Sequence, residues 1–424
     1  MEKKYAKIYL TACSALISCF FVVSIQAAPL IATDAHSLAQ GGTGVASSTS
    51  TNAVFYNPAM LATFRQDDDF SLETPIVSGK IDDQNDLYRW QNDFRKNNYI
   101  AKFSQALINL QGTNDNDQSF VERRQFAASQ GTDLLNALEN LSHKNLEAHA
   151  SSALIIGIPS KKIGISAFAN MWGNVHARAI IANADVNSME SALAILNGDR
   201  IDDIFTLIDP IENFTSFAEL TGLIVTEFGF SIASEETLLQ HQFTWGITPK
   251  FKDIRSYDYK FIAKEFDQAE YILHNGEKNH KHLNFDMGIA GYINSFWNYG
   301  FVIKDVIPRS LNTALNHTIE LKPQARIGIA RTARRTTFAF DYDLTETQLL
   351  TNARKYQFAS VGTEIDFRLL QLRLGYRYNL PDAKMSELTA GFGLWLFGIH
   401  ADMAIATNQQ RNGLSAAAQL GIRF

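Results

Sequence analysis

Apolar and polar residues alternate along most of the chain from about residue 146 onward, in runs of about nine to twelve residues. In residues 371–380, for example, the leucines and tyrosines share one face and Arg373 and Arg377 lie on the other. A period of two is typical of a β-strand with two different faces. Soluble strands average about five or six residues, whereas a tilted strand that crosses a membrane needs about nine to eleven. The pattern therefore predicts an all-β fold, a transmembrane antiparallel β-barrel with lipid outside and a polar lumen inside.

The alternating runs predict about fourteen strands, and the long and short connections between them alternate in turn. The strands are expected near residues 70–80, 146–158, 162–173, 222–233, 241–252, 283–293, 298–307, 317–330, 336–344, 356–368, 371–380, 387–396, 398–407 and 413–424. Residues 254–273 would add a hairpin and give sixteen strands, and either count is even, as in single-chain bacterial barrels. The long connections 81–145, 184–221, 274–282 and 345–355 fall at one end of the barrel, and short ones such as 159–162 and 331–335 fall at the end that holds the chain termini.

Three prolines lie inside predicted strands. Pro75, Pro249 and Pro323 each lack the amide hydrogen that a strand ladder uses, and a closed barrel has no free edge to accommodate them. We therefore expect a bulge or a strand break at each, and a bulge that kinks a wall strand could open a lateral gap toward lipid.

The first 27 residues have the composition of a cleaved secretory signal peptide. Three lysines precede an apolar run from Ile8 to Ile25, and small residues lead to cleavage after Ala27. The run could also span a bilayer as an anchor, but no positive stop-transfer cluster follows it. Both cysteines, Cys13 and Cys19, lie in this leader, so the mature chain is predicted to have no disulfide, thiolate metal site or cysteine nucleophile. The leader and the barrel together predict the bacterial outer membrane, with its lipid as the surroundings.

Neither charge nor motifs indicate an enzyme or a nucleic-acid-binding protein. The 424 residues carry a formal net charge of -6, which argues against direct nucleic-acid binding through a basic surface. The Gly41-Gly42-Thr43-Gly44 run follows no strand and no Lys-Ser/Thr follows it, so it does not predict a nucleotide loop. Residues 274–282 contain three histidines and residues 67–69 three aspartates, but a hydrated loop is the better interpretation of each. We expect no catalytic residue, no cofactor and no resident metal.

Two long connections carry helical periodicity. Leu134, Leu138 and Leu141 recur at i, i+4 and i+7, and a similar pattern runs from Met189 to Leu196. These patterns predict helical extracellular insertions near residues 100–145 and 185–221. The helices are expected either to pack on the outer rim of the barrel or to form a lid or partner-docking surface above the lumen.

Residues 34–62 are small, rich in Gly and Ser, and end in Asn57-Pro58-Ala59. This segment resembles the N-terminal hatch of the FadL-type long-chain fatty-acid transporter superfamily. Residues 300–307, 340–346 and 361–377 resemble the plasmid-transfer TraF barrel proteins, a branch associated with conjugal transfer. The resemblance implies a barrel (70–424) whose lumen holds the N-terminus (28–69) as a plug.

The hatch motif that the resemblance indicates comprises Gly42, Gly44, Asn57, Pro58 and Ala59. Small side chains suit a compact segment inside a lumen, the glycines permit tight turns, and Asn-Pro favours a sharp turn into the wall.

Charged residues on the predicted lumen face form a ladder of Arg326, Arg373 and Arg377 with Glu320 and Asp343. They are expected to neutralise one another inside a polar bore, with a selectivity filter as the alternative. The terminal Phe424 is similar to the aromatic signal that barrel-assembly machinery recognises.

The residues and the resemblance together favour a non-enzymatic envelope component or channel of a conjugal transfer or secretion apparatus, with proteins of that apparatus as partners. The alternative is a FadL-like transporter that takes long-chain fatty acids or other hydrophobic small molecules across the outer membrane. An outer-membrane enzyme would need catalytic side chains clustered at one rim, and the sequence singles out none.

Overall fold

The computed structural model describes residues 33–63, 69–83, 85–112, 118–198, 203–204, 207, 209–238, 241–262, 276–348 and 354–424. The predicted leader, the first residues of the predicted hatch (28–32), two of the three aspartates at 67–69, His274, and most of the additional hairpin at 254–273 lie outside the described residues.

Fourteen antiparallel strands form one closed barrel, in which β1 pairs with both β2 and the last strand, β16. The barrel strands are β1 (Ser71–Asp82), β2 (Asn145–Ile158), β3 (Gly164–Ile180), β4 (Phe217–Leu238), β5 (His241–Ile262), β6 (Glu277–Tyr292), β7 (Trp297–Lys304), β10 (Gln324–Ala333), β11 (Thr336–Asp343), β12 (Phe358–Asp366), β13 (Leu370–Asn379), β14 (Glu387–Leu396), β15 (Ile399–Asn408) and β16 (Gly413–Arg423). The predicted fold class and the count of fourteen are confirmed. The count of sixteen is wrong, because residues 254–262 continue β5.

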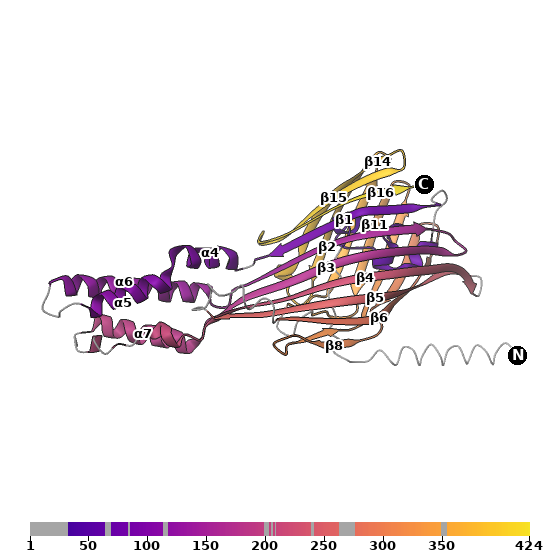
Figure 1. Cartoon of the computed structure of the whole chain (residues 1–424). Helices are drawn as coiled ribbons and strands as arrows, with labels where there is room; N and C mark the ends of the chain where they lie inside the picture. Colours follow the sequence, from indigo (N-terminus) through magenta and orange to yellow (C-terminus); the bar gives the residue numbers. More distant parts are fainter. Residues whose placement is uncertain are drawn as a thin grey trace.

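The connections alternate in length as predicted, but the extent of the predicted connection 274–282 is wrong. Residues 277–282, with His280 and His282, belong to β6 (Glu277–Tyr292) and not to a hydrated loop. Short connections such as 159–163, 293–296 and 334–335 lie at the end of the barrel that holds the C-terminus, and the long connections 83–144 and 181–216 lie at the other end (Figure 1). The helices are α2 (Ala35–Ala39), α3 (Ala53–Tyr56), η1 (Pro58–Ala62), α4 (Leu87–Asn97), α5 (Tyr99–Gln111), α6 (Gln118–Leu141), α7 (Asn183–Asn197), η2 (Pro210–Asn213) and η4 (Ala383–Met385). Among the described residues, no helix is both long and apolar enough to cross a membrane.

The three prolines disturb the strands in three different ways. Pro75 lies in a bulge, because the register of β1 shifts by one residue between Glu73 and Ile76 against both neighbouring strands. Pro323 breaks the predicted strand 317–330, which separates into β9 (Thr318–Leu321) and β10. At Pro249 the register holds, but the β4–β5 pairing is interrupted between Gly229 and Ile232.

The two faces of the wall have the predicted polarity. In β13, Leu372 and Leu374 are 45% and 59% exposed on the outside, whereas Arg373 between them is 2% exposed and points into the lumen. An outer face of exposed aliphatic and aromatic side chains suits contact with hydrocarbon, which requires every strand to be paired, as it is in a closed barrel.

One side of the barrel is much taller than the other. Strands β3, β4 and β5 have 17, 22 and 22 residues, more than the nine to eleven or so that cross a membrane. We call the part of β3–β5 that extends beyond the neighbouring strands the tall wall. Figure 1 shows helices α4–α7 at its far end, away from the barrel.

The helices at the end of the tall wall, which we call the helical arm, have a core of their own. Their apolar side chains pack on one another, including Phe103 and Leu110 of α5, Phe120 and Leu134 of α6, and Met189 of α7. The predicted helical insertions are present, and their apolar faces are buried within the arm instead of on the barrel rim. The arm can therefore present its outer surface to a partner without uncovering the barrel.

Candidate functional site

The N-terminal segment, residues 33–63, lies inside the barrel (Figure 1). Helix α2 packs its Leu38 and Ala39 against small side chains of the wall, Ala404, Ala406 and Ala417. At the other end of the segment, η1 contacts β3, β4, β5 and β6. The segment thus touches strands on different sides of the lumen and fills the space between them.

The Asn57-Pro58-Ala59 sequence begins the last turn of this segment. Asn57 is extended, as a residue before proline prefers, and its Oδ1 accepts a hydrogen bond from the Ala59 amide at 3.1 Å. Its Nδ2 donates to the carbonyl of Val45 at 2.9 Å and to that of Ile289 in β6 at 3.1 Å. One side chain therefore joins the turn, the segment and the wall.

The glycine turn of the segment is held by two wall side chains. Gly41 and Gly42 have φ angles of 71° and 79°, a conformation that favours glycine. The Gly41 amide donates to Thr389 Oγ1 at 2.9 Å. The amides of Gly44 and Val45 both donate to one carboxylate oxygen, Asp341 Oδ2, at 2.8 and 3.0 Å.

The wall makes room for the segment with glycines that point inward. A Cβ on Gly288 would lie 1.9 Å from Asn57 Oδ1, and a Cβ on Gly375 would lie 2.3 Å from the backbone of Gln40. The same close approach occurs at Gly246, Gly300, Gly328, Gly362 and Gly391. Several of these are direct cross-strand partners, such as Gly300 with Gly328 and Gly362 with Gly375. These seven inward-facing glycines, which we call the glycine band, leave the space that the N-terminal segment occupies against the wall.

The predicted lumen charges divide into buried pairs and one outlier. Arg326 pairs with Asp343 and also donates to the Gly42 carbonyl at 3.2 Å. Arg373 pairs with Glu364 at 2.6 Å and also with Asp402, and Arg377 pairs with Glu387 at 2.6 Å. Because each arginine has a carboxylate partner, these groups neutralise one another in the described structure.

Glu320 does not belong to this set. It lies on β9, outside the barrel sheet, and pairs with Lys322 at 2.7 Å with 35% of its side chain exposed. The expectation that it faces the lumen from a wall strand is therefore wrong, because Pro323 ends β9 before the wall resumes.

A second group of buried charges was not predicted. Lys250 of β5 lies 2.8 Å from both Asp286 and Asp305, and Lys252 lies 2.7 Å from Glu227. Lys304 of β7 donates to the carbonyl of Phe55 in the N-terminal segment at 2.6 Å. Lys250, Lys252, Glu227 and Asp286 have apolar neighbours along their strands, so period two indicated their inward direction but not their partners. Asp305 follows the end of β7 and was not predictable in this way.

Asp341 was also missed as a site residue. The sequence places it two residues before Asp343, on the same face of β11, so its inward direction was predictable. Its two hydrogen bonds to the N-terminal segment were not, because they join residues almost three hundred positions apart.

Two connections at the mouth of the barrel also fold inward. The first is a hairpin of β8 (Arg309–Asn312) and β9, which packs Leu311, Ile319 and Leu321 on the inner face of the tall wall. Placing Glu320 on the lumen face of the predicted strand 317–330 implied that its neighbours Ile319 and Leu321 face lipid. This is wrong, because β9 is not a wall strand.

The second inward connection precedes β12. Tyr356 donates to Glu147 of β2 at 2.8 Å, and Arg354 lies 2.7 Å from Asp82. Burial and the Glu147 carboxylate raise the pKa of Tyr356 well above its usual value.

Phe424 extends β16 to the end of the chain. Its backbone exchanges hydrogen bonds with Phe70 at 3.0 and 3.1 Å, and its ring is 63% exposed. The terminal residue thus closes the barrel next to β1, and its role in recognition by the assembly machinery stays a prediction.

Comparison with known proteins relates this chain to a protein family. The family described as F plasmid transfer operon, TraF, protein matches residues 54–343, more than half of the chain. The chain belongs to this TraF family. The match to the TraF family runs from the end of the N-terminal segment to β11, so it includes the tall wall, the helical arm and the β8–β9 hairpin.

Solved structures share the fold of this TraF-family chain. The toluene transporter TbuX of Ralstonia pickettii is similar with a TM-score of 0.51 and 12% identity, over 92% of this chain and 98% of that one. The toluene transporter TodX of P. putida is similar with a TM-score of 0.50 and 12% identity, over 93% and 99%. No curated protein matches the chain.

Proposed function

We propose that this protein is a non-enzymatic outer-membrane barrel that serves as an envelope component or channel of a conjugal transfer apparatus. In this proposal the leader (1–27) is removed on export, the hatch (28–69) plugs the lumen, and the barrel (70–424) spans the membrane. Membership of a plasmid-transfer family supports the choice of apparatus.

The helical arm is the observation that carries this proposal. It is raised on strands of up to 22 residues and has a buried core separate from the barrel. Diffusion of a small molecule through a pore needs no such extension, whereas a component that contacts other proteins beyond the membrane surface does. Exposed apolar side chains on the arm include Ile108, Val121 and Phe126, at 61%, 54% and 57% exposure.

The test measures plasmid transfer after substitutions on the arm and, as a control, after substitutions on the barrel. Changing Val121 and Phe126 together to Lys should lower the frequency of plasmid transfer from donor cells at least tenfold while the protein still shows the heat-modifiable gel shift of a folded barrel. Matched changes of Ile163 and Leu238 to Lys, each 63% exposed at the opposite end of the barrel, should leave transfer unchanged. Normal transfer by the Val121/Phe126 variant would remove the support for an arm that docks proteins.

Transport of hydrophobic small molecules is the second candidate. The plugged lumen, the bulge at Pro75 in the wall and the fold shared with toluene transporters favour it. In this case the protein should raise uptake of labelled toluene or a long-chain fatty acid into cells, and deleting the arm at residues 87–141 should not reduce that uptake. A lateral opening at the Pro75 bulge stays a prediction.

A further inference from the structure

The β8–β9 hairpin is attached to the tall wall at two levels. Along its two strands, the apolar contacts of Leu311, Ile319 and Leu321 hold it against β4 and β5. At its tip, the turn of residues 313–317 is closed by a hydrogen bond from the Thr313 amide to the His317 carbonyl at 2.8 Å. The side chain of His317 then reaches from this turn to the wall.

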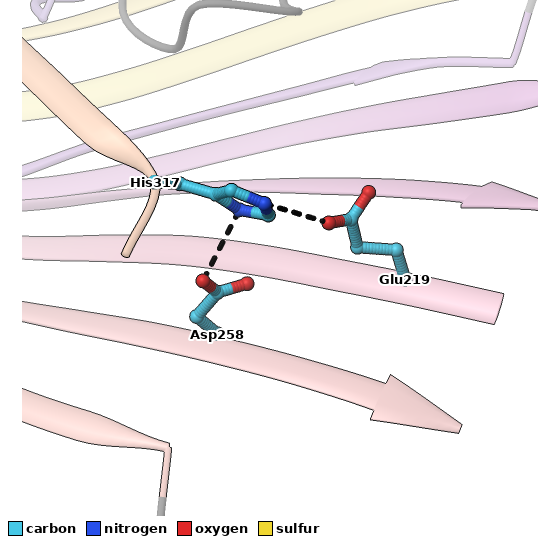
Figure 2. A group of neighbouring side chains, drawn as sticks. All are labelled: Glu219, Asp258 and His317. Atoms are coloured by element: carbon cyan, nitrogen blue, oxygen red, sulfur yellow. Dashed lines mark ion pairs between the residues drawn. The ribbon is translucent and has the colours of Figure 1, made fainter. Parts of the chain in front are cut away.

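His317 lies between two buried carboxylates that come from neighbouring strands (Figure 2). Its Nε2 is 3.3 Å from Glu219 Oε1 of β4, and its Nδ1 is 3.1 Å from Asp258 Oδ2 of β5. The two carboxylate side chains are 8% and 0% exposed, whereas that of His317 is 37% exposed. Solvent can therefore deliver or remove a proton at the imidazole without displacing the wall.

The protonation state of the imidazole decides how many of these contacts attract. A neutral imidazole has one N–H, so it can donate to Glu219 or to Asp258, and its other nitrogen then directs a lone pair at a carboxylate oxygen. An imidazolium donates from both nitrogens at once. The observed arrangement is thus complete only when the imidazole carries the second proton.

The other charged and titratable groups near the hairpin come from β3, β5 and β6, and they include His280 and His282 on the inner face of β6. Arg178 of β3 pairs with the second oxygen of Glu219, and Lys278 of β6 donates to the Thr313 carbonyl at 2.8 Å. Lys260 of β5 lies over the Phe217 ring, 3.8 Å from its centre, and His176 of β3 is buried beside Thr221. The Thr313 and Thr221 hydroxyls donate to Asp258 at 2.6 and 3.2 Å. Among the described residues, the cation paired with Asp258 is His317.

A metal ion fits this group less well than a proton. Glu219, Asp258 and His317 do offer ligand atoms within 4.8 Å of one another. One ion can take only one ring nitrogen, however, whereas the two nitrogens here point to different carboxylates, and Arg178 already binds Glu219. With Arg178 counted, a neutral His317 leaves one net negative charge, which a proton cancels and a divalent ion would reverse.

We propose that the β8–β9 hairpin is a proton-operated latch at the lumen mouth. Protonation of His317 fastens the tip of the hairpin to Glu219 and Asp258. Deprotonation makes one of these two contacts repulsive and so favours release of the tip against the remaining bonds of Thr313 to Asp258 and Lys278, while the apolar contacts of the hairpin strands remain as a hinge. The latch should hold in acid and release as the pH rises toward 8. A role for the latch in opening and closing the lumen rests on the proposed function, but the movement of the hairpin tip does not.

The test is a distance measurement on the full mature protein in detergent micelles. Residues 28–424 contain no cysteine, so Leu315→Cys at the tip and Lys384→Cys across the mouth place two spin labels cleanly. We expect one narrow distance at pH 5.5. At pH 8 the ratio of held to released tip should fall about tenfold, as for the loss of one charge-assisted hydrogen bond.

Variants separate the latch from general effects of pH. His317→Gln should show the released distribution at both pH values, and His317→Lys, a permanent cation, should hold the tip at both. His241→Gln, at the exposed first residue of β5, should respond as the unchanged protein does. An unchanged distance between pH 5.5 and 8, or an equal pH response in His317→Gln, would overturn the latch. If Zn²⁺ restores the held distance at pH 8 in the unchanged protein but not in His317→Gln, a metal ion and not a proton operates the latch.

A failed latch would leave the channel proposal standing, because transfer frequency and toluene uptake are measured without reference to the hairpin. Conversely, a pH-dependent distance in a protein that neither supports transfer nor takes up toluene would retain the latch and remove the proposed function.

Discussion

Replacing Asp341 with Ala should loosen the N-terminal segment in the lumen. One oxygen of this carboxylate accepts the amides of both Gly44 and Val45, at 2.8 and 3.0 Å. Both amides belong to residues that are fully or almost fully buried, so water cannot replace the acceptor while the segment stays in place. The substitution leaves the barrel strand itself intact, because β11 still pairs through its backbone with β10 and β12.

The size of the effect follows from the two orphaned donors. A buried donor without an acceptor costs about 1–3 kcal/mol, so two cost at least about 2 kcal/mol when the segment is seated. When the segment leaves the lumen, water satisfies both amides. The equilibrium should therefore shift toward the unseated state by at least about 2 kcal/mol, or about 30-fold.

Thiol labelling can measure that shift. Ser48 is 7% exposed within the segment, and a Ser48→Cys variant of the cysteine-free mature chain should react with a maleimide only when the segment unseats. With opening faster than labelling, the rate reports the unseated fraction. Asp341→Ala should therefore raise the labelling rate of Cys at this position at least 30-fold.

The control removes a carboxylate that does not touch the segment. Asp366 lies at the end of β12 and accepts the Arg368 amide within its own turn. Asp366→Ala should leave the labelling rate within about twofold. If Asp341→Ala and Asp366→Ala label at the same rate, the two hydrogen bonds do not hold the segment, and the reasoning is refuted.

Three further predictions concern other parts of the molecule. Asn57→Ala removes the bonds to Val45 and Ile289, and it should also raise labelling at position 48 by about tenfold, whereas normal labelling would show that the turn holds without them. Gly288→Ala places a Cβ 1.9 Å from Asn57 Oδ1, so labelling at position 48 should rise in a protein that still shows the gel shift of a folded barrel. An unchanged labelling rate would show that the inward glycines are not needed to seat the segment. Tyr356 should keep its hydrogen bond to Glu147 as the pH rises from about 9 to about 11, because a raised pKa means that the phenol stays a protonated donor above its ordinary value near 10. Exchange of the Tyr356 amide, which donates to Thr347, should therefore show no titration in this range once corrected for intrinsic rate, and a titration near pH 10 would contradict this.

The sequence by itself determined the barrel, most of its strands and the direction of most side chains. These depend on period two, which is a local property: each residue of a strand faces opposite to its neighbours whatever the strand pairs with. Arg373 and Leu374 could therefore be assigned to opposite faces before any partner was known. The same reasoning indicated disturbance at Pro75 and Pro323, because a missing amide hydrogen is also a local property.

Only the tertiary structure decided where strands end, what fills the lumen and which charges meet. Alternation continues through Tyr257 and Phe261 beyond the membrane, so it could not distinguish an extra hairpin from the tall wall. It also could not show that Leu321 leaves the wall, or that His317 lies between Glu219 and Asp258. Such contacts join residues that are far apart in the chain, and their energies depend on burial and distance that exist only once the barrel has closed.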